Sequence, residues 1–131
     1  MSLANPTTTN GAVRGAGADS RAKLVAALAT VPGLLASSSV PDQATAGAAW
    51  PRWVQTTYSG RLCELSVHEY DVVVVLPADY AATTVDQGDV FRDLVAPVLN
   101  RVGSIAYAEP TLVAFNDNQT MPGIRFRVTC R

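Results

Sequence analysis

The stretch that decides the fold is "LCELSVHEYDVVVVLP", residues 62–77. From Glu64 to His68 polar and apolar residues alternate, which is typical of a half-buried strand. From Val72 to Leu76 every residue is apolar, and such a run fits a strand that is covered on both faces. The pattern predicts a central strand in a sheet that carries helices on at least one face.

The segment before it, "WPRWVQTTY" at residues 50–58, is rich in aromatic and β-branched residues and predicts a second strand. Pro51 cannot donate a hydrogen bond to a neighbouring strand, so this strand should lie at an edge of the sheet or begin there. Ser59-Gly60 is suited to a turn, and the two strands are therefore expected to form a hairpin.

The segment after it begins with Thr84-Val85-Asp86-Gln87, which matches a capping box. The apolar residues that follow recur at helical spacing: Val90, Phe91, Leu94, Val95, Val98, Leu99 and Val102. We expect one helix over residues 84–102, kinked at Pro97 and stopped by Gly103. With Leu94 in this stripe and Val74 in the central strand, both Leu94→Asp and Val74→Asp should prevent folding.

The chain ends in two more expected strands. The third spans Ser104–Phe115, with a bulge or an edge at Glu109-Pro110. Turn residues at 116–119 lead into the fourth, Met121–Arg131, where apolar and polar residues alternate.

At the other end, residues 1–18 are small, polar and rich in glycine, and we expect a flexible arm there. A helix over residues 20–31 follows, and then a long connection at 34–49 that is expected to be functional or to pack against a partner. Residues 19–131 are thus predicted to form a single α+β domain, with the order α-β-β-α-β-β. Its four-stranded sheet should be antiparallel, a mixed sheet being the alternative, with helices on one face.

The composition and net charge of the chain argue against some classes of function. The 131 residues are 48% hydrophobic and 16% charged, with a formal net charge of -1, which argues against a general nucleic-acid coat. The sequence predicts neither a membrane span nor a secretory signal. Cys63 and Cys130 lack the spacing of a metal site and are expected to be reduced, buried thiols.

No catalytic residue, metal site or cofactor is predicted. The single histidine, His68, shares a strand face with Ser66, but no nucleophile elbow or oxyanion loop accompanies them, and a half-exposed strand histidine is expected. The nearby carboxylates match no metal-binding motif; they are Glu64, Glu69, Asp71 and Asp79. The chain is therefore not expected to be an enzyme.

Five residues are candidates for contact with other molecules. Trp50 and Trp53 lie beside an expected sheet edge and suit a subunit interface. Arg125, Arg127 and Arg131 share the polar face of the last strand. Three interpretations of these arginines stay open: solvent exposure or pairing with acids of a neighbouring strand, contact with another protein subunit, or sequence-blind contact with DNA phosphates.

The order of elements resembles the tail terminator proteins of long-tailed siphophages, especially those that infect actinobacteria. The resemblance spans about residues 20–131 and comprises the first amphipathic helix, "YDVVVVLP", "TTVDQGDVFRDLVAPVLNRVG" and the final hairpin "YAEPTLVAFNDNQTMPGIRFRVTCR". The long N-terminal arm departs from it.

The resemblance implies a virion structural protein that is assembled in the host cytoplasm. Six copies would form a ring on the head-proximal end of the tail tube, stop polymerisation of the major tail tube protein, and dock the head-completion or stopper protein. DNA would pass through the ring without specific recognition. The alternatives are another head–tail connector or tail completion protein, or a small ligand-binding regulatory α+β domain.

Overall fold

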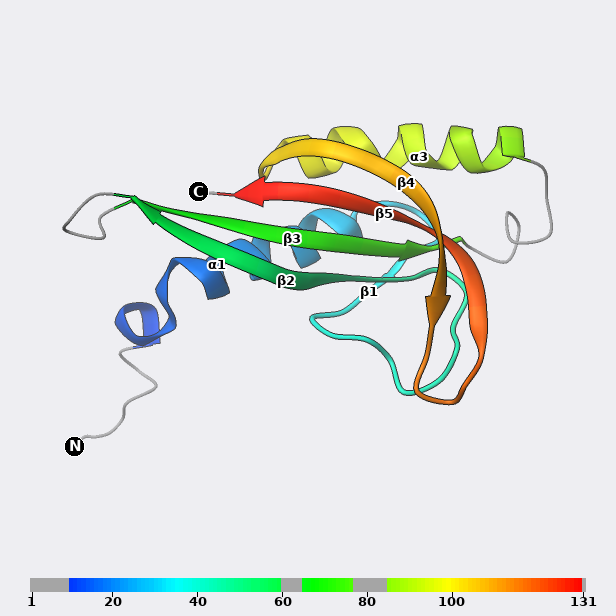
Figure 1. Ribbon diagram of the computed structural model, residues 1–131, viewed down its shortest axis with the longest axis horizontal. Helices are drawn as coiled ribbons and strands as arrows, with labels where there is room; N and C mark the ends of the chain where they lie inside the picture. Colours follow the sequence, from blue (N-terminus) through cyan, green and yellow to red (C-terminus); the bar gives the residue numbers. More distant parts are fainter. Residues whose placement is uncertain (1–9, 60–64, 77–84, 131) are drawn as a thin grey trace.

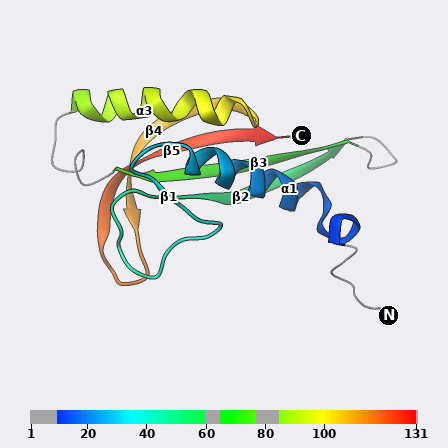
Figure 2. The same ribbon diagram turned by 180° about the vertical axis from the view of Figure 1, so that it is seen from behind.

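The computed structural model describes residues 10–59, 65–76 and 85–130. The elements follow the chain as α1 (Asn10–Ala29), β1 (Leu35–Ala36), β2 (Ala48–Ser59), β3 (Leu65–Val75), α3 (Val85–Asn100), β4 (Ser104–Ala114) and β5 (Thr120–Cys130). The strands form one sheet in the order β1-β2-β3-β5-β4 (Figure 1). Both helices lie on the same face of this sheet (Figure 2), so the predicted α+β class is confirmed.

The sheet has five strands and is mixed, so the predicted number of four strands is wrong. The additional strand, β1, has two residues and pairs in parallel with the start of β2. It is held by backbone hydrogen bonds from Leu35 N to Gly47 O (2.8 Å) and from Ser37 N to Ala49 O (2.9 Å). Two residues are too few to produce a recognisable alternation. All other strand pairs are antiparallel.

The predicted central strand is confirmed. β3 lies between β2 and β5, and Val72, Val74 and Val75 are fully buried while Val73 is 9% exposed. β2 is covered on its outer side by β1 only at Ala48 and Ala49. From Pro51 onward β2 borders the sheet, as expected for a strand that contains proline.

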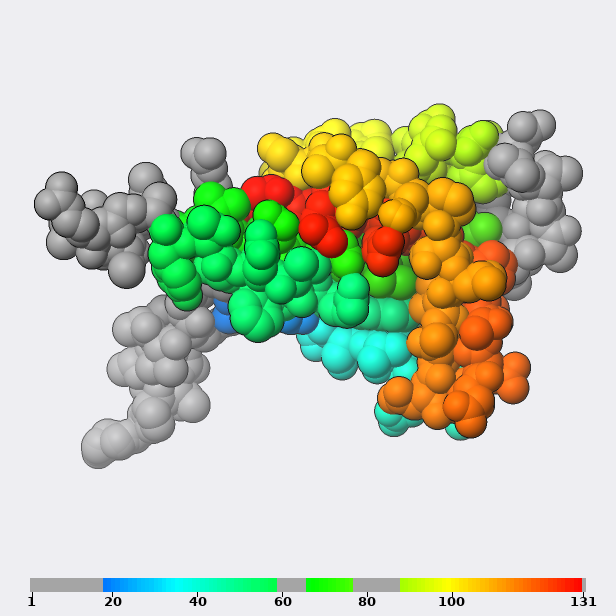
Figure 3. All heavy atoms as spheres, in the orientation of Figure 1, coloured from blue at the N-terminus to red at the C-terminus, as the bar shows by residue number. Residues whose placement is uncertain are grey.

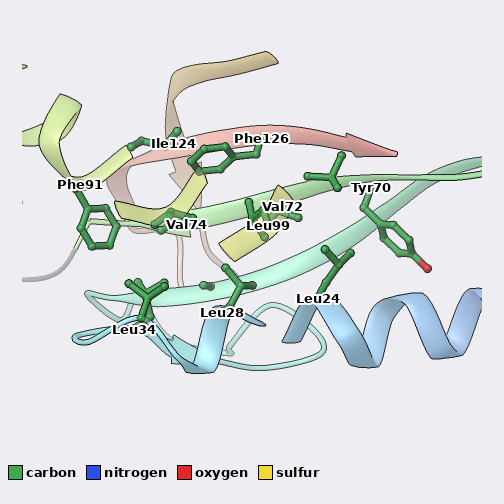
Figure 4. Packing of buried hydrophobic residues seen from close by; sticks show 14 of the residues in the cluster. Leu24, Leu28, Leu34, Tyr70, Val72, Val74, Phe91, Leu99, Ile124 and Phe126 are labelled. Atoms are coloured by element: carbon green, nitrogen blue, oxygen red, sulfur yellow. The ribbon is translucent and has the colours of Figure 1, made fainter. Parts of the chain in front are cut away.

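The main core fills the space between the helices and the sheet (Figure 4). Leu24 and Leu28 of α1 and Phe91 of α3 belong to the same buried cluster as Val74 of β3 and Phe126 of β5. On the opposite face the hairpin of β4 and β5 bends across one end of the sheet (Figure 1) and closes a smaller cluster. That cluster comprises Ala48, Trp50, Val73, Val75, Val113 and Phe115.

Helix α3 is a single helix that runs through Pro97, as predicted, but the inclusion of Leu94 in the core is wrong. Val90 and Leu94 are 54% and 51% exposed, whereas the adjacent Phe91 and Val95 are 1% and 0% exposed. Successive helical residues point about 100° apart, so an apolar stripe that contains both sets is wider than the face that the sheet can cover.

The sequence predicted where each of the two helices begins. Helix α1 begins at Asn10, ten residues before the predicted start at 20, and its first turns fall within the segment 1–18 that was expected to be an arm. Residues 1–9 lie outside the described residues, as does Thr84 of the predicted capping box.

Candidate functional site

The face of the sheet opposite α1 and α3 carries all the charged residues of the described strands. They are Arg52 on β2, Glu69 and Asp71 on β3, Arg125 and Arg127 on β5, and Glu109 on β4. The register explains this clustering, because Asp71 lies opposite Arg52 on one side and Arg127 on the other. Figure 3 shows this face, with side chains of β5 between those of β2 and β4.

Asp71 is the centre of the cluster. Its side chain is 1% exposed, and its two oxygens accept hydrogen bonds from Arg127 Nε (2.7 Å) and Arg52 Nη2 (2.8 Å). Burial alone would raise the pKa of Asp71, but the hydrogen bonds and charges of the two arginines outweigh it and hold the pKa below its usual value. Glu69 extends the cluster, with Arg127 Nη1 at 3.4 Å and Gln55 Nε2 at 3.2 Å.

A second ion pair joins the two C-terminal strands. Arg125 Nη2 lies 2.9 and 2.8 Å from the two carboxylate oxygens of Glu109, and this hydrogen bonding raises the pKa of Arg125. The guanidinium of Arg127 lies over the ring of Tyr107, 5.7 Å from its centroid. Three arginines thus face three carboxylates, and the charges of these six side chains cancel.

The predicted interface residues fall in different environments. Trp50 is 5% exposed and packs edge-on against Phe115, with ring centroids 5.9 Å apart. Trp53 is 57% exposed, and its Nε1 donates to Thr56 Oγ1 at 2.9 Å. Arg125 and Arg127 belong to the ionic cluster, and Arg131 lies outside the described residues.

His68 is buried, at 6% exposure, so the expected half-exposed histidine is wrong. Its Nδ1 lies 2.9 Å from Thr56 Oγ1 and its Nε2 lies 3.1 Å from Ser66 Oγ. Both ring nitrogens therefore have hydroxyl partners, and the group that would orient this histidine for catalysis is a threonine instead of a carboxylate.

The remaining predictions from the sequence concern a metal site and the state of the two cysteines. Within residues 10–59, 65–76 and 85–130, no group of three or more His, Cys, Asp or Glu side chains could hold a metal ion; Glu64 and Asp79 lie outside those ranges. Cys130 is 2% exposed, and burial raises the pKa of its thiol. Cys63 lies outside the described residues.

The sequence placed Arg125 and Arg127 on one face but did not identify their partners. The available signal was a matching alternation in two distant strands: Glu69 and Asp71 are spaced like Arg125 and Arg127. Two such pairs of opposite sign suit neighbouring antiparallel strands.

No helix among the described residues is long and apolar enough to cross a membrane. Comparison of the whole chain with protein-family models and with curated proteins found no match.

Proposed function

We propose that the protein is a virion structural subunit, a tail terminator that forms a hexameric ring between the phage tail tube and the head-completion proteins. The observation that carries this proposal is that the sheet ends in two open strand edges that bear exposed apolar side chains. Within the described part of the chain, no strand pairs with the outer side of β4, and only the first two residues of β2 are covered by β1.

The exposed side chains beside these edges are large. Trp53 and Tyr58 on β2 are 57% and 65% exposed, and Tyr107 and Leu112 on β4 are 44% and 73% exposed. Aromatic and aliphatic side chains at an open sheet edge favour association with another chain. A ring subunit needs two different contact surfaces of this kind, one for each neighbour.

The ionic cluster supports contact with protein more than contact with DNA. Binding to phosphates draws on unneutralised basic side chains, and here the arginines of the described strands are paired with carboxylates. A ring that caps a growing tube acts by covering subunit surfaces, which requires no catalytic group.

Deletion of the gene from the phage tests the function. We expect tails of irregular and excessive length and no joined particles in electron micrographs, with normal particles restored when the gene is supplied in trans. Normal tails on DNA-filled heads after deletion would contradict the proposal.

Copy number in isolated tails tests the ring. Mass measurement should give six copies of this chain at the head-proximal end of each tail. A copy number that is incompatible with six-fold symmetry would contradict the hexamer, whereas a monomer in solution before assembly is compatible with it.

A further inference from the structure

The sign of the charge alternates from strand to strand across the sheet. β2 carries one arginine, β3 two carboxylates, β5 two arginines and β4 one glutamate, in the spatial order β2-β3-β5-β4. Each inner boundary between strands is therefore bridged by ion pairs: Arg52 with Asp71, Arg127 with Asp71, and Arg125 with Glu109.

The alternation gives opposite charges to the two edges of the sheet. These edges are the β2 border, which is β2 from Pro51 onward, and the β4 border, which is the outer side of β4. At the β2 border the side chain of Arg52 is 62% exposed, although one of its nitrogens contacts Asp71. At the β4 border Glu109 is 37% exposed and Tyr107 is 44% exposed. One border thus offers a guanidinium, and the other offers a carboxylate beside an aromatic ring that already contacts Arg127.

We propose that the partner at these borders is a second copy of this chain, placed head to tail, with the β4 border of one copy against the β2 border of the next. Arg52 of one copy then meets Glu109 and Tyr107 of its neighbour, and the alternation of charge continues across the junction. Contact between two β2 borders or two β4 borders would instead bring like charges together. The inference depends on the proposed function in one respect only, which is that the repeated head-to-tail contact closes into a ring.

Side chains carry most of this contact, because both borders limit backbone pairing. Pro51 on β2 and Pro110 on β4 have no N–H to donate, and each strand has a register shift, at Trp53/Gln55 and at Ile105/Tyr107. These features also oppose indiscriminate edge-to-edge aggregation. The exposed apolar side chains beside the two borders would contribute buried contact area where few backbone hydrogen bonds can form between the copies.

Thiol cross-linking can test the head-to-tail arrangement. Gln55 on β2 and Ser104 on β4 are exposed residues at opposite edges of the sheet. They lie at the same level of the sheet, because Gln55 lies opposite Glu69, Glu69 opposite Thr129, and Thr129 opposite Ser104. In a Cys63→Ser background, Gln55→Cys and Ser104→Cys are made singly and together. A short bismaleimide tolerates an offset of about two residues along the strand, roughly 7 Å.

The double variant should form a ladder of cross-linked species in the purified protein or in isolated tails. Each single variant alone should give no dimer above the Cys63→Ser background, and a mixture of the two should give dimers only. The matched control combines Gln55→Cys with Ala29→Cys, an exposed position at the end of α1, and should give no ladder.

Dimers from either single variant alone would overturn the inference, and so would a double variant that gives no more product than its control in both preparations. Tails of irregular and excessive length after gene deletion, combined with no cross-linking, would uphold the terminator function and reject this contact. A head-to-tail ladder in the purified protein, combined with normal tails after gene deletion, would uphold the contact and reject the function.

Discussion

Arg127 donates a hydrogen bond from Nε to Oδ1 of Asp71 across 2.7 Å, although 56 residues separate them in the chain. Arg52 donates to the other oxygen, Oδ2, at 2.8 Å. The buried carboxylate therefore receives one hydrogen bond from β5 and one from β2, and it ties three strands together at one level of the sheet. A carboxylate with 1% exposure is tolerated only when it is paired in this way.

Asp71→Asn should lower the free energy of unfolding by about 3 kcal/mol, because it removes the negative charge that pairs with two arginines and leaves one of them facing an amide NH2 in place of an acceptor oxygen. The measurement is urea denaturation at neutral pH. Asp93→Asn is the matched control: Asp93 is 72% exposed and pairs with Arg92 on the helix surface, so its loss should cost less than about 1 kcal/mol. Equal effects of the two variants would contradict a structural role for the cluster.

The low pKa of Asp71 predicts a contribution to acid sensitivity. Burial opposes ionisation of this group, but the hydrogen bonds from Arg127 and Arg52 prevail, so the folded-state pKa lies below the unfolded value of about 3.9. The stabilisation is present above the unfolded pKa and is lost as the pH falls through the folded one. Urea midpoints measured from about pH 5 down to pH 3 should fall more steeply for the wild type than for Asp71→Asn. Parallel curves would show that Asp71 does not contribute.

Long periodic segments made most of the fold predictable. The apolar run Val72–Val75 and the helix Val85–Asn100 both occur where the sequence placed them. The two-residue strand β1 could not be predicted, because its pairing depends on backbone contacts with Gly47 and Ala49 that have no sequence pattern.

The candidate site was predictable only in part. Alternation along a strand shows which residues share a face, but the partners depend on strand order, and β5 lies between β3 and β4. The pairing of Arg127 with Asp71 follows from that order. The burial of Trp50 likewise depends on a bend in the β4–β5 hairpin that brings Phe115 over it.

Gly123→Ala should destabilise the protein by about 1–3 kcal/mol, because a methyl group there would be overpacked. An added Cβ would lie 2.6 Å from the carbonyl oxygen of Val74 and 2.9 Å from Cγ2 of Val113. Gly88→Ala in α3 is the control: its Cβ meets nothing within 4 Å, and replacing a helical glycine should stabilise by up to about 1 kcal/mol. Thermal unfolding should show a lower Tm for Gly123→Ala and a higher Tm for Gly88→Ala. An unchanged Tm for Gly123→Ala would show that the hairpin can move away from β3.

Neighbouring positions on α3 separate the buried face from the exposed one. Val95 is fully buried between the helix and the sheet, whereas Leu94 is 51% exposed. Val95→Asp should cost more than about 4 kcal/mol and prevent folding, since it buries an unpaired carboxylate, and Val74→Asp in the central strand should do the same. Leu94→Asp should cost less than about 1 kcal/mol, mainly through the lower helix propensity of aspartate. Circular dichroism and urea denaturation of soluble protein distinguish these outcomes. A Leu94→Asp variant that fails to fold would place Leu94 in the core, as its helical spacing alone predicts.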